Sequence, residues 1–217
     1  MVMKEDILLL GMGAHAHSVI DSIERTGKYH IIGFLDIEEM QGMSYKEYSV
    51  LGTDAAMKNY YDKGVRNAFV TIGFLGHGKI RERLYWQLKD IGYILPNIID
   101  DTAVKAENVK IGEGIFIGKN AVVNTGAAIG DMCIVNTGAV IEHDSKVGSF
   151  SHIAVGTVLC GGVIVGEATM IGANATVIQG VTVGNRCIVG AGTVVHRDLQ
   201  DNFLRYGTME KRKDINE

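Results

Sequence analysis

A six-residue repeat constrains the fold of this chain more than any other feature. From residue 111 to residue 195, every sixth position is Ile, Val or Leu without exception. The next residue is most often Gly, and the residue four places after the aliphatic one is mostly Ala, Ser, Thr or Cys. A hexapeptide period is the signature of a β-helix. We therefore predict that residues 111–195 form stacked coils.

Each hexad supplies one short strand and one turn. The aliphatic residue points into a narrow interior and the small residue fits beside it, whereas Gly and Asn suit turns that need a positive φ. Three hexads make one triangular coil, and stacked coils pair their backbones at about 4.8 Å. Because one coil cannot bury its own apolar face, the stacking supplies the core. A β-sandwich, the alternative, requires alternating strands at wider spacing, and the sequence shows none.

Length, composition and net charge exclude some classes of function. The chain has 217 residues, enough for one large or two small domains, with 28 Gly, one Pro and a net charge of −4. This charge gives no reason to expect nucleic acid or an anionic membrane as a partner. We find no signal peptide and no apolar run that could span a membrane, so we expect a soluble, cytoplasmic protein. The three Cys residues show neither metal nor disulfide spacing.

The first hundred residues follow a different pattern, in which strands and helices alternate. We predict parallel strands at residues 6–11, 30–36, 68–73 and 93–99, and helices at residues 18–25 and 77–91. The second helix places Ile80, Leu84, Leu88 and Ile91 on one apolar face. The pattern predicts a small, parallel, Rossmann-like α/β domain over residues 1–100, followed by a β-helix domain over residues 101–217.

The loop after the first predicted strand carries part of a dinucleotide-binding fingerprint. Gly11 and Gly13 follow the strand and open a helix, which is the position that the motif requires. Amides at a helix N-terminus can hold a phosphate, and His15 can add a hydrogen bond. Asp36, at the end of the second strand, is placed to bind a sugar or a base edge. A tight turn with a capping residue is the alternative interpretation.

Exceptions to the repeat are concentrated in one zone. The position after the aliphatic residue becomes Asn, Glu, Ala or Cys at five places between residues 124 and 160, and this zone also holds His143 and His152. His143 and Gly161 are 18 residues apart, one whole coil, so we predict that they stack about 4.8 Å apart. His143 could then act as a base in proton transfer, with Asp144 orienting its ring, while a substrate carbonyl approaches the backbone amide of Gly161.

Two other interpretations of these histidines remain. Both side chains could be turn residues that bond to solvent. They could also bind a metal ion together with histidines of adjacent coils, but the zone has no third His, and His196 lies beyond the end of the repeat. We therefore favour a general base at His143 and expect no metal.

Nearly the whole chain resembles a known family. The most specific segments are residues 136–137, 141–144, 150–152 and 155–156, which read NT, IEHD, FSH and VG. With the glycine loop and the hexads, they resemble the hexapeptide-repeat sugar acetyltransferases, and are similar to UDP-N-acetylbacillosamine N-acetyltransferases and sialic acid O-acetyltransferase-like enzymes. The resemblance implies a left-handed β-helix, a homotrimer, and acetyl-CoA bound between subunits. It also implies N-acetylation of a nucleotide-linked amino sugar, such as a UDP-4-amino-sugar, for bacterial surface glycans.

The resemblance assigns roles by position. His143 matches the general base, Asp144 its supporting carboxylate, and Gly161 the glycine whose amide meets the thioester carbonyl. Asn136 matches a substrate-binding residue, and His152, Val155 and Gly156 match residues that bind acetyl-CoA. Gly11, Gly13, His15 and Asp36 match the nucleotide-sugar loop, and Gly73 and Arg81 match the segment that closes its pocket. Lys211 and Arg212 lie in the tail, which departs from the family pattern, and are only candidates for contacts with CoA phosphates.

Departures from the family pattern leave alternatives open. Asp144 stands where Glu is frequent, the segment after Gly73 lacks an expected Asn, and the tail lacks a Pro-Ala pair. Transfer to a sugar hydroxyl is the alternative activity, and a non-catalytic trimeric scaffold is a weaker one. No covalent enzyme intermediate is needed, so we do not expect Cys160 to act as a nucleophile.

Overall fold

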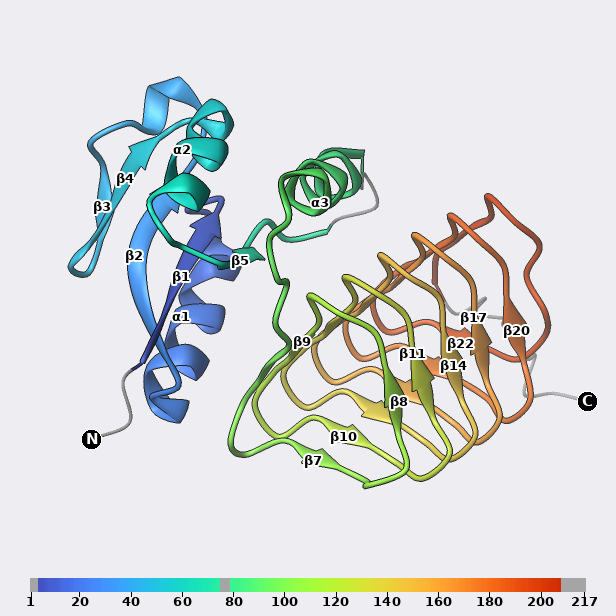
Figure 1. Ribbon diagram of the computed structural model, residues 1–217. Helices are drawn as coiled ribbons and strands as arrows, with labels where there is room; N and C mark the ends of the chain where they lie inside the picture. Colours follow the sequence, from blue (N-terminus) through green and yellow to red (C-terminus); the bar gives the residue numbers. More distant parts are fainter. Residues whose placement is uncertain (1–3, 75–78, 208–217) are drawn as a thin grey trace, which may run out of the picture.

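The computed structural model describes residues 4–74 and 79–207, which form an α/β domain and a parallel β-helix side by side (Figure 1). The predictions for residues 75–78, Lys211 and Arg212 lie outside these ranges. Within the described ranges, each helix is too short or too polar to cross a membrane.

A five-stranded sheet and three helices build the α/β domain. The elements are β1 (Glu5–Leu10), α1 (Ala14–Thr26), β2 (Tyr29–Leu35), β3 (Ser44–Tyr45), β4 (Tyr48–Gly52), α2 (Met57–Asp62), β5 (Asn67–Val70) and α3 (Lys79–Ile91), with 3₁₀ helices at Glu38–Met40 and Asp54–Ala56. The strand order is β3-β4-β2-β1-β5. Residues 7–10 of β1 are apolar and fully buried, as expected for a central strand that is covered on both faces.

Several elements of this domain differ from the sequence prediction. The sheet is mixed and not purely parallel, because β3 pairs with β4 in antiparallel fashion. β3, β4 and α2 lie in a region for which the sequence predicts no element. α1 begins at Ala14, directly after Gly13, and not at Ser18. The strand predicted at residues 93–99 is reduced to Ile98–Ile99, which belongs to the β-helix.

The β-helix has three flat faces, which we number in chain order. The first face contains β6 (Ile98–Ile99), β9 (Phe116–Ile117), β12 (Ile134–Val135), β15 (His152–Ile153), β18 (Met170–Ile171), β21 (Ile188–Val189) and β23 (Leu204–Arg205). The second contains β7 (Val104–Lys105), β10 (Val122–Val123), β13 (Val140–Ile141), β16 (Val158–Leu159), β19 (Thr176–Val177) and β22 (Val194–Val195). The third contains β8 (Lys110–Ile111), β11 (Ala128–Ile129), β14 (Lys146–Val147), β17 (Ile164–Val165) and β20 (Thr182–Val183).

Two corners of these coils matter for the site. The chain turns from the first face to the second at what we call the first corner, and from the second face to the third at the second corner. Each strand pairs in parallel with the strand one coil later, as Val122 does with Val140. Corresponding corner residues of successive coils therefore lie above one another along the axis (Figure 1).

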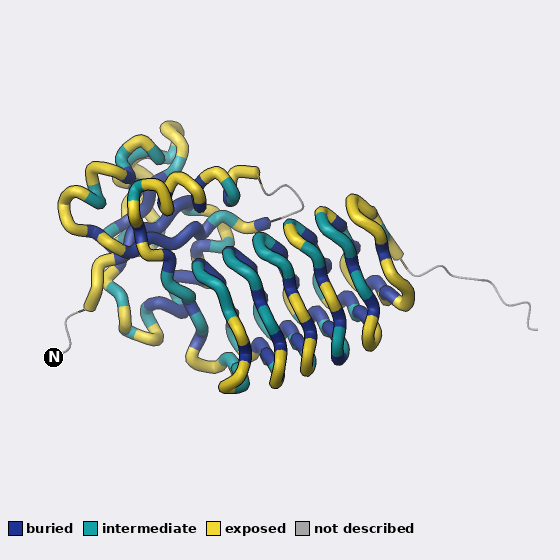
Figure 2. Tube along the Cα trace, turned by 45° about the vertical axis from the view of Figure 1, so that its right-hand side comes forward, coloured by how far each residue is buried: buried dark blue, intermediate teal, exposed yellow. Residues whose placement is uncertain are grey.

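The interior of the β-helix is filled by the aliphatic and small positions of the repeat. The aliphatic anchors from Ile117 to Val195 are all buried, and so are Cys133 and Cys187. Exposed residues are concentrated at the turns (Figure 2). Positive φ occurs three residues after the aliphatic residue, where Gly138 and Gly156 have φ values of 65° and 66° and Asp144 has one of 60°. The Gly directly after the aliphatic residue lies outside that region and allows close stacking of the coils instead, since a Cβ atom on Gly148 would be 2.6 Å from the Glu167 nitrogen.

The α/β domain covers part of the first face. Phe116 and Ile134 point outward from this face and join the apolar cluster that contains Val19, Ile20 and Phe34 of the α/β domain. The outward side chains of the second and third faces are exposed or half-buried. The first face is thus the junction between the α/β domain and the β-helix, and the second and third faces of the β-helix remain accessible.

Candidate active site

His143 follows β13 and lies at the second corner. Its Nδ1 is 2.9 Å from Asp144 Oδ2. The side chain of His143 is 51% exposed and that of Asp144 is 73% exposed. Because an imidazole that donates from Nδ1 leaves Nε2 as an acceptor, Asp144 fixes the tautomer in which Nε2 can take up a proton.

Gly161 lies directly beneath the ring of His143, as the one-coil spacing predicts. A Cβ atom built on Gly161 would be 2.5 Å from His143 Nε2 and 2.6 Å from Cε1. The adjacent Gly162 N–H donates to the His143 carbonyl at 2.8 Å. The Gly161 N–H, by contrast, has no acceptor within the described part of the chain. This corner therefore presents a ring nitrogen and a free backbone amide next to each other.

A carboxylate that sequence reasoning left without a role supports the second corner. Glu142 Oε2 accepts from the backbone N–H of His143 at 3.2 Å and from Asn124 Nδ2 at 3.1 Å. Both Asn124 and Glu142 occupy positions where the repeat usually has Gly. The sequence therefore contained a sign of this role, because both residues replace the usual Gly. The physical reason for the replacement is that their side chains form hydrogen bonds that support the His143 backbone.

His152 and Asn136 lie together at the first corner. His152 is in β15, is 7% exposed and is covered by the segment that follows β5. Its Nδ1 donates to the Phe74 carbonyl at 2.8 Å, and its Nε2 is 3.3 Å from Asn136 Nδ2. Burial, with a contribution from Arg81, lowers the pKa of His152. A neutral ring that donates from Nδ1 accepts at Nε2, so Asn136 donates to it.

Val155 and Gly156 lie at the same corner, one coil beyond Asn136. The Gly156 N–H donates to the Thr137 carbonyl at 2.9 Å, and the side chain of Val155 is 45% exposed. The predicted site residues of the β-helix are therefore divided between two corners. Asn136, His152, Val155 and Gly156 are at the first corner, whereas His143, Asp144 and Gly161 are at the second. The second face separates the two groups within one chain.

The glycine loop of the α/β domain is organised by Asp36. Its Oδ2 accepts from the Met12 N–H at 2.6 Å and its Oδ1 accepts from the Ile37 N–H at 2.7 Å. Gly11 has a φ of +98°, and a Cβ atom on it would overlap Ile72. Gly13 caps α1 and has open space beside its Cα. The loop thus keeps a clear approach to the N-terminus of α1, where an anion is favoured.

Two other residues predicted for the nucleotide-sugar pocket are shielded. His15 packs edge-on against Phe116, with ring centroids 5.1 Å apart, and its Nε2 is shielded from solvent and has no hydrogen-bond partner among the described residues. Burial, with the charges of Arg81 and His152, lowers the pKa of His15 to about 3. Gly73 is exposed and lies against His15. These contacts place His15 at the junction of the two parts as a neutral ring.

Arg81 is fully buried and does not line the hollow at the glycine loop. Its guanidinium donates to the Met132 carbonyl, while Nε and Nη1 have no hydrogen-bond partner in residues 4–74 and 79–207. The hollow beside Gly11 and Asp36 is lined by Arg83, which forms an ion pair with Asp54 at 2.8 Å. Sequence reasoning missed Arg83, although it lies one helical turn from Ile80, which also lines the hollow.

Comparisons with known proteins bear on both parts of the chain. The family "PglD N-terminal domain" matches residues 6–88, and the family "Hexapeptide repeat of succinyl-transferase" matches residues 108–143 and 162–197. The chain is similar to a mutant perosamine N-acetyltransferase from Caulobacter crescentus, solved with CoA and GDP-perosamine, at 35% identity over 98% of each chain with a TM-score of 0.89. The chain belongs to the hexapeptide-repeat sugar acetyltransferases.

A second solved structure agrees with this membership. The acetyltransferase domain of PglB from Neisseria gonorrhoeae is 31% identical over 93% of this chain and 96% of that one, with a TM-score of 0.86. Membership in the hexapeptide-repeat family confirms the predicted left-handed parallel β-helix behind a small α/β domain. Within residues 4–74 and 79–207, no group of three or more His, Cys, Asp or Glu side chains is arranged to hold a metal ion.

Proposed function

We propose that this protein is an acetyl-CoA-dependent N-acetyltransferase that acts on the amino group of a nucleotide-linked amino sugar, for bacterial surface glycans. The observation that carries the proposal is the ring of His143 packed against Gly161, whose N–H has no acceptor among the described residues. The perosamine N-acetyltransferase and the PglB domain support it, because the former was solved with CoA and GDP-perosamine and the latter with acetyl coenzyme A.

The second corner supplies what acetyl transfer from a thioester needs. The acceptor amine attacks the thioester carbon, so that the N–C bond forms and the C–S bond breaks. His143 Nε2 takes the amine proton and passes it to the leaving thiolate, while Asp144 stabilises the imidazolium. The Gly161 N–H donates to the carbonyl oxygen as its negative charge develops, and one such donor contributes about 3 kcal/mol in other acyl transfers. Cys160 has no part in these steps.

A ladder of valines on the second face supports a homotrimer. Its outward positions are Val104, Val122, Val140, Val158, Thr176 and Val194, and Val104 is 62% exposed. A contiguous apolar surface of this kind marks a protein interface. If three copies bury this face around a three-fold axis, the second corner of one subunit meets the first corner of its neighbour. His143 then faces Asn136 of the partner subunit, and the two halves of the site join.

The remaining assignments follow from this arrangement. Residues 1–100 hold the nucleotide-sugar at Gly11, Gly13 and Asp36, and residues 101–217 carry the transfer. Acetyl-CoA lies between subunits, against Gly161 of one chain and against the Val155 and Gly156 surface of its neighbour, whereas the predicted contact with His152 is not retained because that ring is buried. We place the reaction in the cytoplasm, which supplies acetyl-CoA, and the three cysteines are free thiols, as in reducing compartments.

A thiol-release assay tests the proposed function. Wild-type protein is mixed with acetyl-CoA and a panel of UDP-, dTDP- and GDP-linked 4-amino sugars, each matched by its 4-hydroxy counterpart. We expect CoA release and an N-acetylated product with at least one amino sugar. Release with the hydroxy sugars alone would replace N-acetylation with O-acetylation. Absence of acetyl-CoA binding by calorimetry would favour a scaffold.

A further inference from the structure

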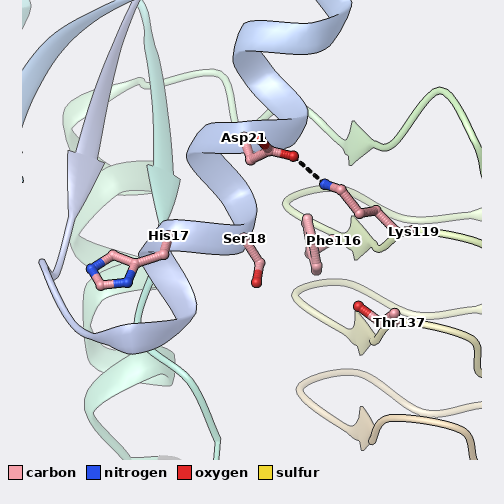
Figure 3. Close-up of a pocket in the computed structure, with 6 residues that line it drawn as sticks. All are labelled: His17, Ser18, Asp21, Phe116, Lys119 and Thr137. Atoms are coloured by element: carbon pink, nitrogen blue, oxygen red, sulfur yellow. Dashed lines mark hydrogen bonds and ion pairs between the residues drawn. The ribbon is translucent and has the colours of Figure 1, made fainter. Parts of the chain in front are cut away.

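A hollow of about 260 Å³ lies between α1 and the first corner (Figure 3). Its lining consists of His17, Ser18 and Asp21 from α1, and Phe116, Lys119 and Thr137 from the β-helix. Thr137 follows Asn136 directly, so the hollow adjoins the first corner. A volume equal to about nine waters suits a single sugar ring and is too small for a whole nucleotide-sugar.

Three charged side chains lie at this hollow, and the two cations near Asp21, which are Arg25 and Lys46, are each paired with a carboxylate of their own. Lys119 forms an ion pair with Asp21 (Figure 3) and another with Asp100 at 3.1 Å. Burial would raise the pKa of Asp100, but hydrogen bonds from Ser22, Thr102 and Lys119 outweigh it and leave the pKa well below its usual range. Asp100 is therefore ionised. Two carboxylates around one ammonium group leave the cluster with a net negative charge.

Of the two carboxylates, Asp21 is the one that a ligand can reach. The side chain of Asp100 is fully buried, whereas that of Asp21 is 46% exposed. Lys119 is the only cationic side chain among the described residues that line the hollow. The ring of His17 stacks on Tyr45, with centroids 3.7 Å apart. A molecule in the hollow thus meets the hydroxyl groups of Ser18 and Thr137 and a partly compensated carboxylate.

We propose that this hollow binds the amino-sugar ring of the substrate, and that Asp21 selects an amine over a hydroxyl by attracting the ammonium form. The inference rests on the proposed function and specifies which chemical class of sugar, an amine and not an alcohol, binds at the first corner. Ser18 and Thr137 are placed to bond sugar hydroxyls. The ammonium releases one proton to solvent before attack, and the partner subunit's His143 accepts the second as the N–C bond forms.

The expected size of the selection follows from the exposure of Asp21. A half-exposed ion pair in water contributes at most a few-fold in affinity, so we expect a factor of about five for the ammonium form. A neutral hydroxyl at the same position of the sugar gains no such attraction. The hollow therefore distinguishes two acceptors of nearly identical shape by charge.

Kinetics of three variants test this inference. In Asp21→Asn, we expect the KM for the nucleotide amino sugar to rise about fivefold, with no change in the KM for acetyl-CoA or in the inhibition constant of the matched 4-hydroxy sugar. Lys119→Gln, which makes the hollow more negative, is expected to lower the amino-sugar KM. Asp62→Asn is the matched control, because Asp62 pairs with Lys58 on α2, away from the hollow, and the substitution removes the same charge.

The outcomes separate this inference from the proposed function. If wild-type protein acetylates no nucleotide amino sugar, both are wrong. If it does, but Asp21→Asn leaves the amino-sugar KM at the wild-type value, the hollow does not bind the amine. If Asp21→Asn weakens the amino sugar and the hydroxy sugar equally, or if Lys119→Gln also raises the amino-sugar KM, Asp21 acts only on structure and charge selection is refuted.

Discussion

Replacing Gly161 with alanine moves the proposed base without removing it. The new Cβ would be 2.5 Å from His143 Nε2, about 1 Å short of ordinary van der Waals contact. The backbone of Gly161 lies outside the left-handed region, so alanine itself fits. The ring is 51% exposed on its side chain and can swing away. The substitution therefore displaces His143 Nε2 by about 1 Å from its place against Gly161.

The effect on catalysis should far exceed the effect on stability. A misplacement of about 1 Å can cost roughly 100-fold in rate, so we expect kcat to fall by about this factor, with little change in the KM for the nucleotide-sugar. Moving one half-exposed ring off its rotamer costs about 0.5–1.5 kcal/mol, so Tm should fall by only a few degrees. The assays are steady-state CoA release and thermal unfolding.

Cys160→Ala is the control for this experiment. It changes the neighbouring residue at the same corner, adds no atom beneath the ring, and should retain full turnover. If Gly161→Ala retained a kcat close to that of wild type with an unchanged Tm, the close fit of His143 over Gly161 would have no role in the reaction. The assignment of base and amide to this corner would then be wrong.

Three further predictions concern stability and assembly. The pKa of His15 is lowered to about 3, so below pH 6.5 the unfolded chain binds a proton that the folded chain does not. The free energy of unfolding should therefore decrease as the pH is lowered, by up to about 1.4 kcal/mol per pH unit. His15→Gln should make this pH dependence less steep between pH 6.5 and about 4, whereas an unchanged slope refutes this origin. Arg81→Met removes a buried charge with two guanidinium nitrogens that have no partner in the described part of the chain, and should leave Tm unchanged or raise it. Arg81→Ala should cost about 2–4 kcal/mol through the cavity it leaves; a large loss of Tm in the Met variant contradicts this. If the proposed trimer forms through the second face, Val140→Lys should give monomers in light scattering while the circular dichroism spectrum is retained, with Ile164→Lys on the third face as control. A trimeric Val140→Lys variant would exclude the valine ladder as the interface.

The sequence predicted the β-helix and the position of His143 well, because a strict repeat converts spacing into geometry. Residues one coil apart must stack, so the pairing of His143 with Gly161 followed from counting. The role of Glu142 did not follow, since its partners are a backbone amide and an Asn side chain whose directions depend on the fold of the turn. The repeat also says nothing about how chains pack, so it cannot bring Asn136 to His143.

The α/β domain was predicted less well, because tertiary contacts override local patterns there. The sequence puts Ile80, Leu84 and Leu88 on the buried face of α3, but Ile80 is 40% exposed and Arg81 is buried in its place. The reason is that α3 packs against the β-helix as well as its own sheet, and Arg81 reaches the Met132 carbonyl. The apolar periodicity of one helix predicts the face that packs on its own sheet, but it does not predict that a second face is buried against another domain.

The most direct test of the shared active site uses mixed trimers of two inactive variants. His143→Ala lacks the proposed base, and Asn136→Ala lacks the polar group at the first corner, while each keeps the other half of the site. If base and substrate come from different subunits, equal random mixing of the two should restore about a quarter of the sites, since each needs one intact corner from each of two chains. We predict acetyl transfer at about a quarter of the wild-type rate in the mixture. Mixed trimers no more active than either parent would contradict a site shared between subunits.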